Sequence, residues 1–296
     1  MSFDAAMRAS GLVPGAVIPD GKWRRCKTTD KPNKRNGAYI LHPDGRGFWR
    51  NWATDDGLNS YREEGVTRAH AVDPSIAERR RQQERAYRLQ AMRSARDFWA
   101  RARPLNRLHP YLERKGLNPQ GCQGLRQHDG MLVVPVWHGE WLVSVQTITP
   151  EGEKRFWPGA PVKAGACVLN RDKAAVTCVV EGLATGLAVY QSVRQARVIV
   201  AFDAGNLLPV IERMKPTGSV VLCADNDHGT LARRGVNPGL EKARNAAEFI
   251  GAGVAFPQDI EGTDWADYLS EHGAQASRRV ERLILAGARY VCATVP

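Results

Sequence analysis

The sequence predicts an α+β chain whose C-terminal part is an α/β domain built on a parallel sheet. Three observations predict this fold class. From residue 176 onward, apolar strand-like runs alternate with helical segments, which is typical of a parallel sheet covered by helices. Residues 20–58 are basic, aromatic and rich in turn residues, as in a small β module. Residues 75–103 carry apolar side chains at helical spacing.

These changes of pattern divide the 296 residues into four parts. A small β-rich basic module (1–70) comes first, and a basic helical segment (71–118) follows it. A segment with strand-like character (119–175) then leads into the α/β domain and its closing helix (176–296). We therefore expect a mixed, partly helical linker region between the first module and the C-terminal domain.

The N-terminal module is predicted from strand-like stretches at 23–27, 38–42 and 48–52, which Pro, Gly and Asn residues separate. Basic and aromatic residues alternate along them. Single-stranded nucleic acid needs this combination, because bases stack on rings and phosphates pair with cations. In so small a unit some rings must also form the core, so both roles stay open. The candidates for binding single-stranded DNA are Trp23, Arg24, Arg25, Lys34, Arg35 and Trp49.

The middle of the chain contains the longest predicted helix, 75–103. Ser75 and Glu78 have the spacing of a capping box, and Pro104 ends the helix. Its many arginines form either a solvated face or a track for phosphates, and the sequence does not choose between them. A short helix and strand-like stretches follow, at 109–115, 131–136, 141–148 and 167–170, of which the middle two form a hairpin.

The C-terminal domain is predicted from buried strands that alternate with helices. The strands are expected at 177–180, 197–202, 219–224 and 253–256, and the helices at 183–194, 207–215 and 238–250. The stretch between Asp227 and Glu241, including His228, is expected to be an extended loop. A helix after Ser277 should pack back on the domain through a face that carries Val280, Leu283, Ile284 and Ala286.

The charge is concentrated at one end of the chain. The net charge is +11, and residues 1–150 carry 25 basic and 15 acidic groups whereas residues 151–296 carry 17 and 16. A basic N-terminal half suits a polyanion such as nucleic acid, because binding releases condensed counterions. A solvated basic surface that favours solubility is the alternative.

Cysteine usage and hydropathy point to a cytoplasmic protein without a membrane anchor. None of the cysteines forms a C-x-x-C pair and the histidines are scattered, so no zinc site is predicted. No apolar run approaches the roughly 18 residues that span a bilayer, and the N-terminus lacks signal-peptide features. The six cysteines are Cys26, Cys122, Cys167, Cys178, Cys223 and Cys292.

Acidic residues follow three successive predicted strands. Glu181, Asp203 and Asp225 each come at a strand end, and Asp227 follows two residues later. The carboxyl ends of parallel strands meet at one edge of a sheet. Clustered carboxylates repel one another unless a cation lies between them, and their hard oxygens suit Mg²⁺ or Mn²⁺. Such a site supports nucleotidyl transfer or phosphodiester cleavage. Capping of helices is the alternative role, most of all for Asp203.

Two of these motifs carry a resemblance to a known family. Val179-Val-Glu-Gly182 and Ser219-Val-Val-Leu-Cys-Ala-Asp-Asn-Asp227 resemble the signature of the Toprim domain, a Rossmann-like fold shared by DnaG-type primases, topoisomerases and certain nucleases. The resemblance implies that Glu181 is an acid/base or metal group and that Asp225 and Asp227 are metal ligands. Asp203 is not part of that signature.

Further motifs are similar to those of the Toprim primases of phages and conjugative plasmids. These are His109-Pro-Tyr-Leu-Glu-Arg-Lys115, Met131–Val136, Lys154-Arg-Phe-Trp-Pro-Gly159 and Thr263-Asp-Trp-Ala-Asp-Tyr-Leu269. The resemblance implies that 119–175 begins the polymerase core and that 176–296 is the catalytic domain. It implies phosphate-binding roles for basic residues near the metal site, and accessory roles for further acids. The basic candidates are Lys154, Arg155, Lys163 and Lys242, and the possible accessory acids from this resemblance are Asp264 and Asp267. Asp203 is a further possible accessory acid, from its place at a strand end alone.

The function predicted from these features is a DNA primase that uses Mg²⁺ or Mn²⁺ to make short RNA primers on single-stranded DNA. Ribonucleoside triphosphates and the template are then the substrates. No P-loop motif is found in the 296 residues, so a separate replicative helicase is a candidate partner. Two alternatives stay open, a Toprim nuclease with the same carboxylates and an inactive single-stranded nucleic-acid-binding replication protein.

Overall fold

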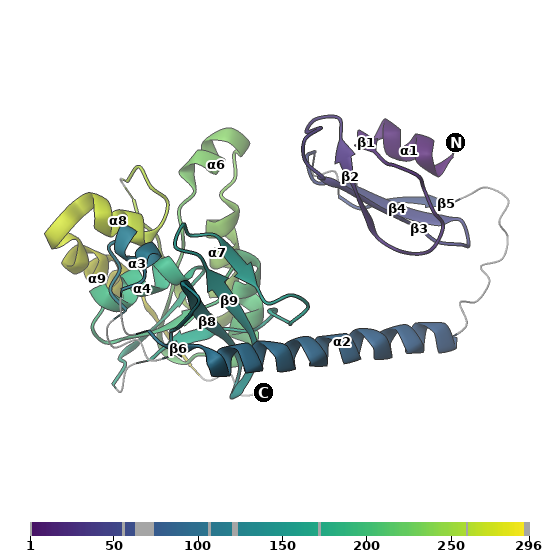
Figure 1. Cartoon of the computed structure of the whole chain (residues 1–296). Helices are drawn as coiled ribbons and strands as arrows, with labels where there is room; N and C mark the ends of the chain where they lie inside the picture. The colour runs from purple at the N-terminus through teal and green to yellow at the C-terminus, as the bar shows by residue number, and fades with distance from the viewer. Residues whose placement is uncertain are drawn as a thin grey trace. The chain divides into compact units, whose positions relative to one another are not determined.

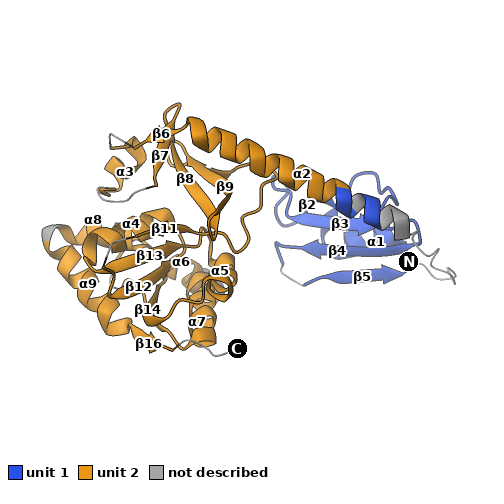
Figure 2. Cartoon of the chain, turned by 90° about the horizontal axis from the view of Figure 1, so that it is seen from below, with its two compact units in different colours: residues 1–82 blue, residues 83–296 orange. Residues whose placement is uncertain are grey.

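The computed structural model describes residues 2–54, 57–62, 74–105, 108–119, 124–170, 173–258 and 260–292. The chain forms two compact units, residues 1–82 and 83–296, which are described separately (Figure 2). The segments 119–175 and 176–296, predicted as separate parts, lie in the same unit. The predicted boundary near residue 70 falls outside the described residues.

The first unit is a twisted antiparallel sheet with a helix on it. Helix α1 (Phe3–Ala9) is capped by Ser2. The strands lie in the order β1-β2-β3-β4-β5. The three expected strands correspond to β2, β3 and β4 within two residues at each end. The sheet is made of β1 (Leu12–Val13), β2 (Arg24–Thr28), β3 (Gly37–Leu41), β4 (Arg46–Asn51) and β5 (Asn59–Arg62).

Aromatic rings form the core of this unit. Phe3 of α1 packs edge-on against Trp49, with ring centroids 5.8 Å apart, and against Tyr39. Gly47 faces the Phe3 ring so closely that any side chain there would overlap it. Trp49 is 6% exposed. The prediction that Trp49 contacts nucleic acid is therefore wrong, because its ring fills the core between α1 and the sheet.

The second unit begins with helix α2 (Pro74–Arg101), which crosses the division between the units. Its last turns cover one face of an antiparallel sheet with strand order β10-β9-β8-β7-β6. Phe98 of α2 and Ala102, just after its end, pack on Val133, Leu142 and Val145 of the hairpin. The elements here are β6 (Arg103–Pro104), α3 (Pro110–Arg114), β7 (Arg126–His128), β8 (Met131–His138), β9 (Trp141–Ile148) and β10 (Lys154–Phe156).

The main sheet of this unit has the strand order β11-β13-β12-β14-β15, with β16 paired to β14. Strands β13, β12, β14 and β15 are parallel, whereas β11 and β16 run antiparallel to their neighbours. Its inner strands are apolar throughout, as expected for a sheet covered on both faces. The strands are β11 (Cys167–Leu169), β12 (Val176–Val180), β13 (Ala196–Val200), β14 (Gly218–Cys223), β15 (Gly253–Ala255) and β16 (Arg289–Val291).

Helices cover both faces of the main sheet (Figures 1 and 2). On one face, Cys178 and Val180 pack with α4 (Leu183–Ser192), α8 (Trp265–His272) and α9 (Ala276–Gly287). On the other, Val179 packs with α5 (Leu207–Met214) and α7 (Pro238–Ile250). Short 3₁₀ turns precede α5 and α9. The predicted α/β class is therefore present, with antiparallel strands added at two places.

Two local predictions were wrong. The stretch after Asp227, expected to be an extended loop containing His228, begins with helix α6 (His228–Arg234), which Gly235 ends with a φ of 70°. Helix α9 does pack back on the domain, but it does so through Ala276, Val280 and Ile284, spaced four residues apart. Leu283 is 39% exposed and Ala286 is exposed as well.

Within the part of the chain that the structure describes, no helix combines the length and apolar character that a membrane crossing requires.

Close packing of α4 on the sheet yields a first prediction. A Cβ at Gly186 would lie 2.8 Å from Val200 Cγ2 and 3.3 Å from Val180 Cγ2. Gly186→Ala should therefore lower the free energy of unfolding by about 1–3 kcal/mol, the usual range for overpacking. Denaturant unfolding of this variant, of Val200→Ala and of the double variant measures the effect. The double variant should lose less than the sum of the two single variants, because the new methyl group occupies the space that Val200 vacates. Strict additivity would contradict this packing.

Candidate active site

The site lies at the carboxyl edge of the main parallel sheet, beside its central strand. Val180, the last residue of β12, pairs with Val200 of β13 on one side and with Cys223 of β14 on the other. The chain leaves β12 through α4 on one face and leaves β14 toward α7 on the opposite face. Ligands of open α/β sheets bind where the connections diverge in this way. Glu181 and Asp225 follow the two strands that border this point.

Glu181 is a half-buried carboxyl group in a mixed electrostatic environment. Burial raises its pKa above the usual range, and the neighbouring Asp203 carboxylate raises it further. A hydrogen bond from the backbone of Ala204 and the positive charges of Lys242 and Lys154 act in the opposite direction. Of the predicted accessory groups, Asp203 is therefore near Glu181. It is exposed, and its side chain makes no capping bond to the 3₁₀ turn that it precedes.

Asp225 is the more strongly perturbed carboxyl group. Burial raises its pKa to about 7, and the negative charge of Glu181 contributes to this rise. The hydrogen bond that Thr185 donates lowers the pKa and opposes both effects. Thr185 lies in the first turn of α4, and its Oγ1 donates to Asp225 Oδ1 at 2.7 Å. The two acids thus oppose each other's ionisation, and a cation between them would relieve this repulsion. Thr185 was not among the predicted site residues, because it carries no signal in the sequence beyond following Glu-Gly182 at the start of a helix.

Asp227, the third predicted ligand, is occupied by a structural role. It is the N-cap of α6, where Oδ1 accepts a hydrogen bond of 2.8 Å from the backbone N–H of Thr230 and Oδ2 accepts one from the Thr230 hydroxyl. Across the described ranges, no three His, Cys, Asp or Glu side chains are gathered closely enough to hold a metal ion. The structure therefore brings Glu181 and Asp225 together but does not gather all three acids into one cluster.

Asn226, between the two aspartates, holds this turn in place. Its backbone N–H donates to Thr263 O at 2.7 Å, and its side-chain amide donates to Pro257 O at 2.8 Å. Its Oδ1 accepts a hydrogen bond of 3.0 Å from the amide of Asn237, the N-cap of α7. Sequence analysis missed this residue because its partners are distant along the chain. These bonds hold the turn that carries Asp225 against the loop before α8 and against the start of α7.

Asp264 and Asp267 line a neighbouring cleft of about 530 Å³ together with Tyr111, Arg114, Lys115 and Lys154. Asp264 caps α8 and forms a capping box with Asp267. Lys115 Nζ lies 2.8 Å from Asp267 Oδ1 and 3.5 Å from Asp264 Oδ2. Burial opposes ionisation of Asp267, but the hydrogen bond from Lys115 prevails and lowers its pKa. Lys115, which sequence analysis missed as a site residue, therefore neutralises this pair.

The predicted basic residues fall into two groups. Lys154 is exposed, lies 5.9 Å from the centre of the Tyr111 ring, and acts on the pKa of both Glu181 and Asp225. Lys242 of α7 is near Glu181 as well. By contrast, the guanidinium of Arg155 is held by Glu153 at 2.7 Å. Lys163 is exposed in a loop, where its backbone oxygen accepts a hydrogen bond from the His138 ring.

The remaining candidates lie on the first unit. Trp23 is 53% exposed, and Lys34 and Arg35 are exposed between β2 and β3. Arg24 is paired with Asp20 through two short bonds, which leaves it less available to phosphate. The Arg25 guanidinium lies 4.3 Å over the ring of Trp52, which is 43% exposed. Trp52, absent from the predicted contacts, is thus an exposed aromatic ring with a cation beside it, the role expected of Trp49.

Comparisons with known proteins show which family the region around these acids resembles. Residues 176–275 match the model of the Toprim domain, so Glu181, Asp225 and Asp227 lie inside the matched region. The chain is 30% identical over 286 residues to a DNA primase TraC of Escherichia coli, covering 86% of this chain and 26% of that protein. A second DNA primase TraC of Escherichia coli is 30% identical over 284 residues, and 19% of it is covered. The chain therefore spans about a quarter or less of the length of these relatives.

Solved primase structures are similar more distantly. The DnaG primase catalytic domain bound to ssDNA matches 69% of this chain and 84% of its own, with 14% sequence identity and a TM-score of 0.41. The primase fragment of the bacteriophage T7 primase-helicase protein matches 61% of this chain and 78% of its own, with 14% identity and a TM-score of 0.42.

The resemblance to Toprim primases that the motifs predicted is thus confirmed, since residues 176–275 match the Toprim domain and the chain is similar to DNA primase TraC along 86% of its length.

Proposed function

We propose that this chain is a DNA primase that joins ribonucleotides into short RNA primers on a single-stranded DNA template. The observation that carries this proposal is the half-buried Glu181–Asp225 pair at the edge of a Toprim sheet, beside a cleft with Lys154 on its wall. The similarity to DNA primase TraC supports it. Because this chain spans only part of those relatives, the activity itself is our proposal.

A divalent cation fits the donor set that the structure presents. Glu181 and Asp225 are hard oxygen donors whose charges oppose each other, which favours Mg²⁺ or Mn²⁺. When bound, such an ion neutralises the charge that develops on an α-phosphate under hydroxyl attack. Asp227 would join this site only by sharing an oxygen that now caps α6. We therefore rank Glu181 and Asp225 as the primary ligands and Asp227 as the third.

The chain's own side chains supply positioning and proton transfer. Glu181, whose pKa is raised by burial and by the neighbouring Asp203 charge, suits the acceptance of a proton from the attacking hydroxyl. Lys154 and Arg114 on the cleft wall would orient triphosphate groups, because both present cations to the same hollow. Lys242 would contact phosphate from the α7 side. Lys115 keeps Asp264 and Asp267 in position as accessory acids.

The first unit would hold the template. Trp23 and Trp52 offer exposed rings, and Arg25, Lys34 and Arg35 offer cations, as single-strand binding needs.

Removal of the Asp225 carboxylate tests the proposed activity. With single-stranded DNA, labelled ribonucleotides and Mg²⁺ or Mn²⁺, the unchanged protein should make short products without an added primer. Asp225→Ala should lower their yield by at least about 100-fold, because phosphoryl transfer depends on charge neutralisation. Template degradation without products would instead identify a nuclease. Template binding without either reaction would identify an inactive binding protein.

The stability of the Asp225 site should depend on pH in a defined direction. The folded protein holds this proton up to a pKa of about 7, whereas the unfolded chain releases it near about 3.9. The stabilisation is therefore complete below about pH 4 and is lost as the pH rises through 7, by up to about 4 kcal/mol.

Asp225→Asn should abolish this loss. At pH 8 in a chelating buffer the variant should have a higher Tm than the unchanged protein, and at about pH 4 the two should agree. Excess Mg²⁺ should narrow the gap at pH 8, because the ion stabilises only the carboxylate form. Parallel melting curves across the whole pH range would contradict a buried, ionised Asp225.

Lys154 and Arg155 should differ in importance although they are adjacent. Lys154→Ala removes a cation beside the two acids, and it should lower primer synthesis about tenfold, the cost of one charge-assisted contact. Arg155→Ala should have a smaller effect, because Glu153 already pairs with Arg155. Initial rates and the salt dependence of template binding measure the difference. Equal losses for both variants would contradict the assignment of Lys154 to the cleft.

A further inference from the structure

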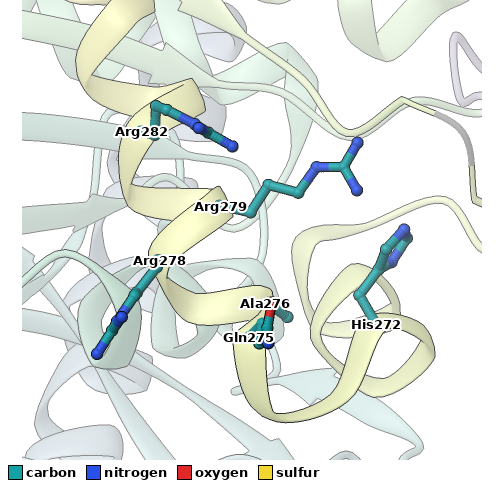
Figure 3. A pocket seen from close by; sticks show the side chains of 6 residues that line it. All are labelled: His272, Gln275, Ala276, Arg278, Arg279 and Arg282. Carbon is teal, nitrogen blue, oxygen red and sulfur yellow. The ribbon is translucent and has the colours of Figure 1, made fainter.

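A second hollow of the Toprim domain is lined almost entirely by cationic and polar side chains. It lies where α8 leads into α9 and has a volume of about 690 Å³ (Figure 3). No acidic residue is among those that line it. The lining consists of His272, Gln275, Ala276, Arg278, Arg279 and Arg282.

The three arginines are placed as neighbours on one helix. Arg282 follows Arg278 by four residues and Arg279 by three, the spacings that bring side chains together on a helix surface. Like charges at these spacings destabilise an isolated helix. All three are exposed, and among the described residues none pairs with a carboxylate. By contrast, Arg24 and Arg155 elsewhere are each held by an acidic neighbour. The arrangement is therefore unfavourable unless an anion neutralises it.

The chemistry of the lining specifies the class of anion. Arginine presents a planar fork of N–H donors that matches the oxygens of a phosphate group. The His272 ring stacks on the Tyr268 ring, with ring centroids 4.1 Å apart. This stacking holds His272 in place at one side of the hollow. Three forks in one hollow suit several phosphates along a backbone better than one isolated anion.

The hollow is linked to the active site by a single helix. Asp264, the N-cap of α8, lines the cleft beside Lys154, whereas His272, the last residue of α8, lines the arginine hollow. The eight residues of α8 span about 12 Å at 1.5 Å per residue. Along the axis of a duplex, successive phosphates of one strand recur roughly every 3.4 Å. Along a duplex axis that runs parallel to α8, the hollow is therefore about three or four nucleotides from the cleft.

We propose that Arg278, Arg279 and Arg282 bind backbone phosphates of the nucleic acid about three or four nucleotides from the reacting end. This inference rests on the proposed function, because it assumes that nucleic acid occupies the cleft. It adds a second contact on the Toprim domain that is separate from the basic first unit. Its role is to hold the strand once that strand is long enough to reach from the cleft to α9.

The test combines a triple substitution with a series of DNA lengths. In the full chain, Arg278→Gln, Arg279→Gln and Arg282→Gln are introduced together, and binding of single-stranded oligonucleotides from about three to about twelve nucleotides is measured by fluorescence anisotropy. The variant should match the unchanged protein for the shortest oligonucleotides and bind the longer ones at least about tenfold more weakly. The slope of log affinity against log salt should fall by about two, since each lost phosphate contact removes 0.7–0.9.

Two further variants control for charge and for geometry. A matched triple variant, Arg194→Gln, Arg213→Gln and Arg244→Gln, removes the same charge from exposed arginines that do not line this hollow. Its affinity for oligonucleotides of every length should stay within about twofold of that of the unchanged protein. A variant with lysine at positions 278, 279 and 282 keeps the charge but loses the fork. Its affinity for the longer oligonucleotides should lie between that of the glutamine variant and that of the unchanged protein. Far-UV spectra and Tm values establish that each variant is folded.

The outcomes separate this inference from the proposed function. Suppose that the unchanged protein makes primers but the 278/279/282 glutamine variant binds oligonucleotides of every length with the same affinity as the matched variant. The arginine hollow is then not a nucleic-acid site, and an acidic protein segment would be its occupant. Equal weakening in both glutamine variants would also overturn the proposal, because it would reflect net charge alone. If the unchanged protein makes no primers but the arginine-dependent effect of length is present, the proposed function fails while the binding site stands.

Discussion

Repulsion between two carboxyl groups is the constraint around which the Toprim domain is arranged. Strand β12 lies between β13 and β14, so the residues that follow it and its neighbour β14 must meet at one edge. Those residues are Glu181 and Asp225, and burial raises the pKa of both. Such an arrangement costs stability in the absence of a cation. A divalent ion between the two carboxylates would remove this cost, which is why we propose a metal site here.

The surroundings of the pair balance this charge without removing it. Thr185 donates one hydrogen bond to Asp225. The positive charges of Lys154 in β10 and Lys242 in α7 lower the pKa of Glu181. Asn226 ties the turn between the two aspartates to the loop before α8 and to the start of α7. In the described part of the chain, neither lysine forms an ion pair with Glu181 or Asp225, so their negative charges are not neutralised by a direct ion pair.

Much of this arrangement was predictable because its signals are local. The strands of the main sheet are short, buried apolar runs, and Glu-Gly and Asp-x-Asp follow two of them directly. The face of a strand in the first unit was harder to assign. Trp49 points into the core and Trp52 is exposed, a difference that depends on which side of the sheet α1 covers. Helix α6 was missed because its sequence has no apolar period, and only the side-chain cap from Asp227 marks its start.

Contacts between distant residues were beyond local patterns. Lys115 neutralises Asp267 although they are 152 residues apart, and Asn226 is bonded to three separate segments. Neither residue belongs to a pattern with a defined chemistry, so only the folded structure reveals its role. Asp227 shows the opposite case, in which a motif residue predicted for metal binding also caps a helix. A carboxylate has two oxygens, and the capping bonds to Thr230 limit how Asp227 can also serve an ion.

Proton release on metal binding tests the central claim most directly. Titration of Mn²⁺ into the protein near pH 7, by calorimetry in buffers of different ionisation enthalpy, counts the protons that each bound ion displaces. Because the pKa of Asp225 is about 7, the account predicts release of about half a proton per ion at that pH. The release should disappear in Asp225→Asn. Tight binding without proton release, or release that persists in Asp225→Asn, would contradict a metal site built on the Glu181–Asp225 pair.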